Sequence, residues 1–144
     1  MRKLLLFMIL VISPVIAVGQ GNSTGEALLK KLVLASEFEF EQEDGFWVTN
    51  YGENDEIVGI VLEVSDELLI VQSWPLEEPV SLSGAKLRSL LSMSYQSNFA
   101  KIGLDDDGDI IVLNEALLSE LSAKEFEQII LGVGGLSQEI LLDF

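Results

Sequence analysis

The chain has 144 residues, 49% apolar and 8% aromatic, which suits one folded domain around a single hydrophobic core. Its 24 acidic and 8 basic residues give a formal net charge of −16, which repels nucleic acids and anionic lipid surfaces. It contains no cysteine and no histidine, which excludes thiol and imidazole catalysis, disulfides and zinc sites built on those ligands.

Residues 1–19 have the order of regions found in a secretory signal peptide. Two basic residues precede an apolar run over 4–12, and small residues after Pro14 suit cleavage after Ala17 or Gly19. The apolar run is interrupted by Pro14 and is shorter than the roughly 20 residues of a membrane span. We therefore expect a periplasmic or secreted protein without a stable membrane anchor, whose mature chain keeps six basic residues and a net charge of −18.

The segment after the signal is predicted to be a short lead-in followed by one domain. Residues 20–25 are small and polar, which indicates a flexible lead-in, and the domain extends over 26–144. Leucines recur at helical spacing over 26–36. From Glu37 the period changes to two, with phenylalanines on one side and glutamates on the other, so a strand is expected to begin there.

Three successive antiparallel strands are predicted next. The turn signal Asp44-Gly45 precedes the first of them, and polar turn residues separate the others. Pro75 and Pro79 should end the third strand, because proline lacks the amide proton that a strand ladder needs. The strands are expected over 46–51, 57–64 and 68–74.

A second helix and a hairpin follow. Ser83 can cap the helix, in which leucines and Tyr95 recur at spacings of three and four. Two β-like runs, over 99–104 and 109–113, flank the turn signal Asp105-Asp106-Asp107-Gly108.

The last helix is predicted to begin after Ser122, which forms a capping box with Glu125. Three glycines interrupt its apolar stripe, each at a cost of about 1 kcal/mol relative to alanine; they are Gly132, Gly134 and Gly135. We expect that packing on the sheet or a second subunit sustains this helix, or that it breaks near Val133. The order helix, three strands, helix, two strands, helix predicts an α+β fold on one antiparallel sheet.

The aspartate-rich turn is the one segment that resembles a ligand-binding motif. With Gly108 at position six of a calcium loop, Asp105 and Asp107 fall on positions three and five, but Gly103 and Asn114 occupy positions one and twelve. A solvated hairpin turn is therefore the favoured interpretation. A calcium-binding or carboxylate-dependent enzyme domain remains the alternative function, although no sequence feature places a pair of acids in a cleft. No catalytic residue, cofactor or metal ligand is predicted.

Three aromatic residues could form a binding platform on the sheet. Trp47 and Tyr51 share one side of a predicted strand, and Trp74 ends another. The favoured interpretation is that they belong to the core. Lys86 and Arg88 are likewise interpreted as a solvated helix face rather than an anion site. The acidic residues from Glu37 to Glu43 are interpreted as the solvent-exposed side of a strand.

The element order resembles that of the class I type III secretion chaperones and the related YbjN family. The segment from Leu90 to Glu127 carries the most recognisable part: a helix followed by Asn98, a strand, an acid-glycine hairpin, a second strand and a helix opened by serine. The resemblance covers residues 26–144. It implies a homodimeric, non-enzymatic domain, because type III chaperones bind a partially unfolded segment of another protein and YbjN-like proteins are described as sensory or regulatory. Those relatives are typically cytoplasmic, whereas this chain has a predicted signal. We therefore expect an exported binding module whose partner is a protein or peptide segment.

Overall fold

The computed structural model describes residues 23–53, 56–76 and 81–144. The predicted signal peptide and residues 20–22 of the predicted lead-in lie outside this described part. The helices are α1 (Ser23–Ala35), α2 (Gly84–Gln96), the short 3₁₀ helix η1 (Leu118–Glu120) and α3 (Ala123–Asp143). The strands are β1 (Glu41–Glu43), β2 (Phe46–Tyr51), β3 (Val58–Ser65), β4 (Leu68–Ser73), β5 (Lys101–Leu104) and β6 (Ile110–Leu117).

The strands form one antiparallel sheet in the order β1-β2-β3-β4-β6-β5. The first four make a meander with tight turns. Asp44 and Gly45 both have positive φ, 48° and 92°, as a two-residue hairpin turn requires. The chain then leaves the sheet through α2 and returns as the β5–β6 hairpin, so β1 and β5 are its two edges. The predicted α+β fold is confirmed.

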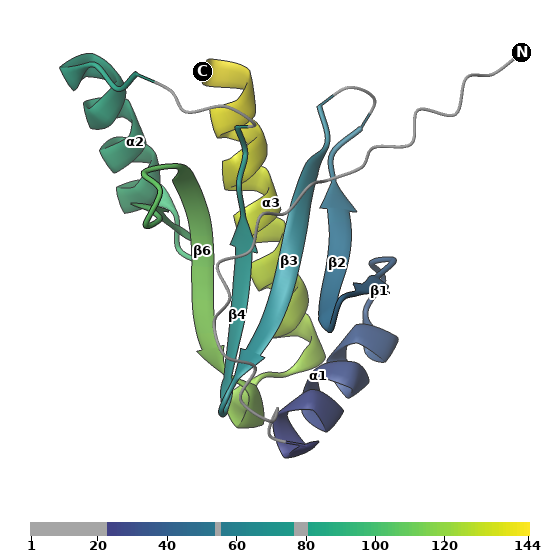
Figure 1. Ribbon diagram of the computed structural model, residues 1–144. Helices are drawn as coiled ribbons and strands as arrows, with labels where there is room; N and C mark the ends of the chain where they lie inside the picture. The colour runs from purple at the N-terminus through teal and green to yellow at the C-terminus, as the bar shows by residue number, and fades with distance from the viewer. Residues whose placement is uncertain (1–22, 54–55, 77–80) are drawn as a thin grey trace, which may run out of the picture.

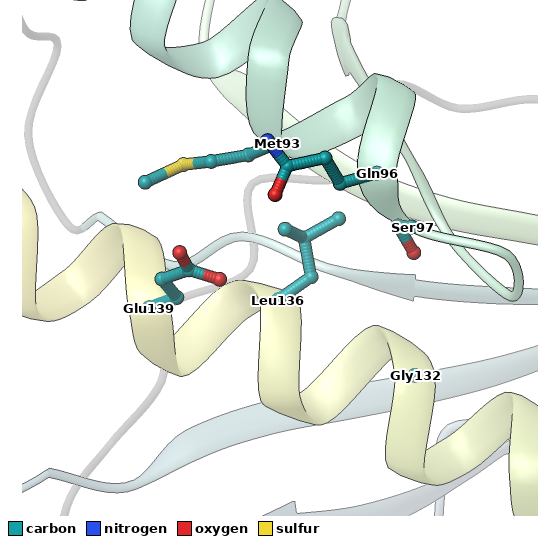
Figure 2. A pocket seen from close by; sticks show the side chains of 6 residues that line it. All are labelled: Met93, Gln96, Ser97, Gly132, Leu136 and Glu139. Atoms are coloured by element: carbon teal, nitrogen blue, oxygen red, sulfur yellow. The ribbon is translucent and has the colours of Figure 1, made fainter.

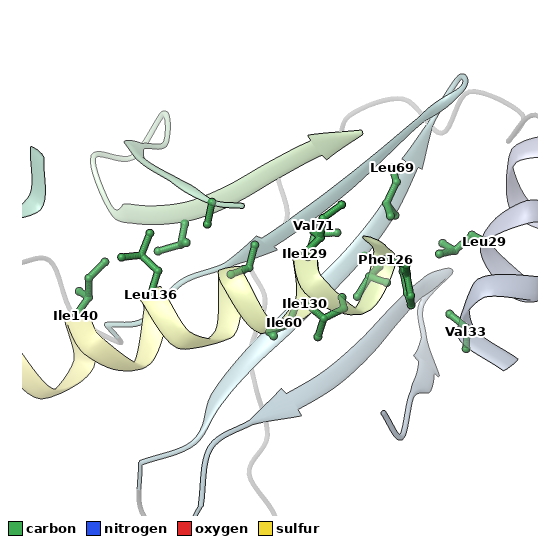
Figure 3. Packing of buried hydrophobic residues seen from close by; sticks show 14 of the residues in the cluster. Leu29, Val33, Ile60, Leu69, Val71, Phe126, Ile129, Ile130, Leu136 and Ile140 are labelled. Carbon is green, nitrogen blue, oxygen red and sulfur yellow. The ribbon is translucent and has the colours of Figure 1, made fainter. Parts of the chain in front are cut away.

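One face of the sheet is covered by α3, which crosses it behind β3 and β4 in Figure 1. Alternate strand residues such as Ile60, Leu62 and Val71 are fully buried beneath this helix. Figure 3 shows Phe126, at the start of α3, among the core side chains, which also include residues of α1. Because the helices pack against one face, the domain has two layers.

The glycines do not break α3, which is continuous from Ala123 to Asp143. A Cβ at Gly134 would lie 2.7 Å from Cδ2 and 2.8 Å from Cβ of Tyr51 on β2. A Cβ at Gly132 would lie 2.6 Å from Cβ of Phe99. Packing therefore sustains the helix, and two of its glycines are needed for close contact with aromatic residues.

Several predicted boundaries differ from the structure. The last strand, expected to end at Leu113, continues to Leu117 because it pairs with β4 up to Leu68, and the run expected from Phe99 is a strand only from Lys101.

The first helix begins at Ser23 rather than at Glu26, and Gly25 in its first turn lies close to the sheet: a Cβ there would lie 2.8 Å from Cγ1 of Val64 on β3 and 3.0 Å from the carbonyl oxygen of Asp66 in the β3–β4 turn. The strand expected from Glu37 pairs only over Glu41–Glu43. The predicted facing holds nevertheless, since Phe38 and Phe40 pack against the core while the neighbouring glutamates are exposed.

Candidate protein-binding surfaces

Helix α2 presents a row of apolar side chains to solvent. Ser83 caps the helix as predicted, its hydroxyl accepting a hydrogen bond of 3.3 Å from the amide of Lys86. Of the apolar residues on the helix, Leu90 is buried, whereas Leu87, Leu91 and Tyr95 are 42%, 69% and 90% exposed. These three residues recur every four positions and therefore lie along one side of the helix. We call them the α2 stripe.

The α2 helix also differs from the rest of the chain in charge. Its 13 residues include Lys86 and Arg88 and no acidic residue. The ammonium of Lys86 lies 4.9 Å from the ring centroid of Phe144, a cation–π contact that joins the C-terminus to this helix. Arg88 is exposed, as expected for a solvated helix face. In a strongly acidic protein, α2 is thus a surface that another acidic molecule can approach.

A notch of about 240 Å³ lies between α2 and α3. Figure 2 shows Leu136 of α3 directed toward α2, with Glu139 at one side. The lining is mixed, apolar at Met93 and Leu136 and polar elsewhere. Its residues are Met93, Gln96, Ser97, Gly132, Leu136 and Glu139.

The face of the sheet opposite α3 forms a second surface. In Figure 1 this face is turned toward the viewer, and no helix of the described residues lies across it. The strand registers place an unbroken row of side chains across it, because directly paired residues point to the same side. We call this surface the open face; it includes Glu41, Val48, Val61, Glu63, Ile70, Gln72, Leu113 and Glu115.

The aspartate-rich segment forms the predicted hairpin turn between β5 and β6, with Gly108 at φ 85°. The Oδ1 atom of Asp105 accepts hydrogen bonds of 3.0 and 2.9 Å from the amides of Asp107 and Asp109. Its Oδ2 accepts a 2.9 Å bond from the indole of Trp74. Burial raises the pKa of Asp105, but these hydrogen bonds together hold it below the ordinary value of 3.8. Both oxygens of the Asp105 carboxylate therefore accept hydrogen bonds from groups of the protein itself.

The three candidate aromatic residues do not form a common platform. Trp47 and Tyr51 share the face of the sheet under α3 and pack against the core, so the core interpretation is confirmed for both. Trp74 follows β4 at a position that is 41% exposed and donates its indole hydrogen bond to Asp105, so the core interpretation is wrong for this residue. Among the described residues, no group of three or more acidic side chains is arranged to hold a metal ion.

Comparison with known proteins identifies the fold. No protein-family model matches the chain, and no curated protein matches it by sequence. Among solved structures, YbjN from E. coli, described as a proposed transcription regulator, matches with a TM-score of 0.55 and 12% identity over 82% of this chain and 89% of that one. A chain of the heterodimeric complex ExoU–SpcU, from the type III secretion system of Pseudomonas aeruginosa, matches with a TM-score of 0.54 and 14% identity over 66% and 80%. The fold is that of YbjN and the type III secretion chaperones.

The resemblance inferred from the element order is thus confirmed at the level of the fold. The domain carries its helices on one side of the sheet, which leaves both the open face and the α2 stripe available for contact. None of the helices in residues 23–53, 56–76 and 81–144 has the length and apolar character of a membrane span.

Proposed function

We propose that this chain is an exported, non-enzymatic module that binds a protein or peptide segment and acts as a homodimer. The observation that carries the proposal is the α2 stripe. Large apolar side chains this exposed along one side of a helix are typical of protein contact surfaces. The two neighbouring folds, one from a heterodimeric complex and one from a proposed regulator, support a binding role.

Charge favours α2 as the contact between two copies. With 24 acidic residues per chain, two copies repel each other over most of their surface. Two α2 helices, each without an acid, can meet without placing carboxylates opposite one another. The adjacent edge strand β5 adds Leu104, and the loop before it adds Phe99, both exposed. A stable interface buries roughly 800 Å² per subunit, so such a contact needs apolar residues beyond the α2 stripe.

The notch beside α2 offers a complementary recess. Tyr95 is almost fully exposed and lies on the same helix as two of the residues that line the notch, Met93 and Gln96. In a twofold dimer each copy supplies both a projecting side chain and a recess. Tyrosines that fill such recesses are commonly the residues that dominate interface energy.

The dimer is tested by light scattering on purified protein. The wild type is expected to have the mass of a dimer at micromolar concentration, and the double variant Leu91→Glu/Tyr95→Glu the mass of a monomer. The matched control is Leu34→Glu/Ile57→Glu, which places the same two charges at apolar residues on α1 and before β3 that are 74% and 48% exposed, and it should remain dimeric. A monomeric wild type, or equal dissociation of both variants, contradicts the proposed dimer.

Export is supported by the order of residues 1–19 and is tested separately. A C-terminally tagged full-length chain, produced in a bacterial host, is expected in the periplasm or medium in a form shortened by about the length of the signal. Replacing both Arg2 and Lys3 by glutamate should retain the precursor in the cell. Full-length protein that remains in the cytosol contradicts the export part alone.

A further inference from the structure

The open face combines aliphatic and acidic side chains in a regular arrangement. Val61 pairs with Val48 on one side and Gln72 on the other, and Gln72 pairs with Leu113. This row crosses β2, β3, β4 and β6. Val48, Val61 and Leu113 are all partly exposed, so an aliphatic band lies across the sheet where water or a partner can reach it.

The next row places acids on both sides of an isoleucine. Ile70 on β4 pairs with Glu63 on β3 and with Glu115 on β6. Neighbouring strands lie about 4.8 Å apart, so the two glutamates stand roughly 10 Å from each other with Ile70 between them. At the β1 edge, Glu41 pairs with Val48 and adds a carboxylate to the end of the aliphatic band.

Basic side chains near this face are directed elsewhere. Lys101 pairs with Leu113 in the register, but its ammonium donates hydrogen bonds of 3.2 and 2.8 Å to the carbonyl oxygens of Ser94 and Ser97 at the end of α2. The ammonium is therefore held at the end of α2, and on the open face itself the three carboxylates of Glu41, Glu63 and Glu115 outnumber this single cation.

The glutamates of the open face determine which classes of partner can bind there. A second copy of the chain would bring Glu63 and Glu115 against the same acids, and nucleic acid or an anionic lipid would bring phosphates. An uncharged partner would remove water from the glutamates without replacing their hydrogen bonds, which is costly. A partner that carries cations beside aliphatic side chains satisfies both components of the face.

We propose that the open face binds a basic amphipathic segment of another protein, in which aliphatic side chains contact Val61, Ile70 and Leu113 and lysine or arginine side chains pair with Glu63 and Glu115. This inference rests on the protein-binding role proposed above and names the chemistry of the partner. It does not depend on α2 or on dimer formation.

Fluorescence anisotropy with labelled short peptides tests the inference. The probes are a peptide of alternating lysine and leucine, one of alternating serine and leucine, and one of alternating glutamate and leucine. The lysine–leucine peptide is expected to bind wild-type protein at least tenfold more tightly than the other two. Measurement at about 0.15 M salt, where the Debye length is about 8 Å, suppresses the attraction of distant charges.

Paired variants distinguish specific binding at the open face from attraction by the net charge of the protein. Glu63→Gln/Glu115→Gln removes two charges from the open face, whereas Glu120→Gln/Asp143→Asn removes two exposed charges from η1 and α3, outside both the open face and the notch. We expect roughly tenfold weaker binding of the lysine–leucine peptide for the first variant and less than a twofold change for the second. Ile70→Thr, which keeps a β-branched side chain at a partly exposed position, should weaken binding several-fold without unfolding the protein.

Each contrary result has a distinct meaning. Equal losses in the two charge variants would show attraction by net charge only and would overturn the inference. Tighter binding of the serine–leucine peptide that is lost in Ile70→Thr would overturn the basic partner while leaving a protein-binding sheet. Absence of binding by all three peptides would overturn the role of the open face, and the dimer measured by light scattering would still stand or fall independently.

Discussion

Replacing Gly134 by alanine is expected to destabilise the domain, although alanine is the better helix former. In a solvent-exposed helix this change stabilises by about 1 kcal/mol. At this position the new methyl group would lie 2.7 Å from Cδ2 and 2.8 Å from Cβ of Tyr51. Those atoms belong to the base of the side chain, so Tyr51 cannot avoid the contact by moving only its hydroxyl end. Relief requires a shift of α3 away from β2.

The control lies on the neighbouring residue. A Cβ at Gly135 would meet the hydroxyl oxygen of Tyr51 at 3.8 Å, an ordinary van der Waals distance. Gly135→Ala should therefore stabilise by about 0.5–1 kcal/mol. Overpacking typically costs about 1–3 kcal/mol, and subtracting the helix gain of about 1 kcal/mol leaves Gly134→Ala less stable than wild type by up to about 2 kcal/mol.

Urea denaturation followed by far-UV circular dichroism measures both variants. We expect their free energies of unfolding to differ by roughly 1–3 kcal/mol, the cost of overpacking, which corresponds to about 4–12 °C in Tm for a domain of this size. A Tyr51→Ala background removes the ring and should reduce the cost of Gly134→Ala by at least about 1 kcal/mol. If Gly134→Ala proved as stable as Gly135→Ala, the steric explanation of this glycine would be refuted.

Three further predictions concern polar groups. Ser122→Ala should destabilise the protein by about 1 kcal/mol in urea titrations, because the Ser122 hydroxyl accepts a bond from the amide of Glu125. The hydroxyl and amide of Ser122 in turn donate to Glu125 and lower its pKa, so the stabilisation by Glu125 is present above pH 4.5 and is lost as the pH falls through its lower folded value. Asp105→Ala should lower the free energy of unfolding by about 1–2 kcal/mol at pH 7, and Trp74→Phe should lower it by about 1 kcal/mol. Because the pKa of Asp105 is depressed in the folded state, the difference in stability between wild type and Asp105→Ala should disappear in melts at progressively lower pH below 3.8. Ser137→Ala should leave stability unchanged or raise it by up to about 1 kcal/mol, since its buried hydroxyl has no hydrogen-bond partner among the described residues; a loss above about 0.5 kcal/mol in urea titrations would contradict this.

Local signals in the sequence predicted the elements that depend on neighbouring residues. The capping box of Ser122 and Glu125 opens α3 where it was expected, with both of its backbone bonds formed. The Asp44-Gly45 turn also follows from local backbone preferences. Local signals could not predict whether α3 continues through its glycines, because this depends on contacts with Tyr51 and Phe99, which are distant in the sequence.

The exposure of the candidate binding surfaces could not be predicted from the sequence as well as the helices and turns could. Spacing groups Leu87, Leu91 and Tyr95 on one side of a helix, but the same spacing describes a buried side, and only the placement of α2 leaves these residues exposed. Alternation along β3 and β4 similarly indicates two faces without showing that helices cover one of them. The acid-free composition of α2 was the available signal that this helix differs from the rest of the chain.

The alternation of glutamates with aliphatic residues on the uncovered side of the sheet also bears on aggregation. An uncovered sheet surface of valine, isoleucine and leucine promotes association of one molecule with another, and like charges placed among these residues oppose that association. Replacing Glu63 and Glu115 by glutamine removes that repulsion while the aliphatic band remains in place. Folded molecules of this double variant should therefore associate through their exposed sheets more readily than those of the wild type.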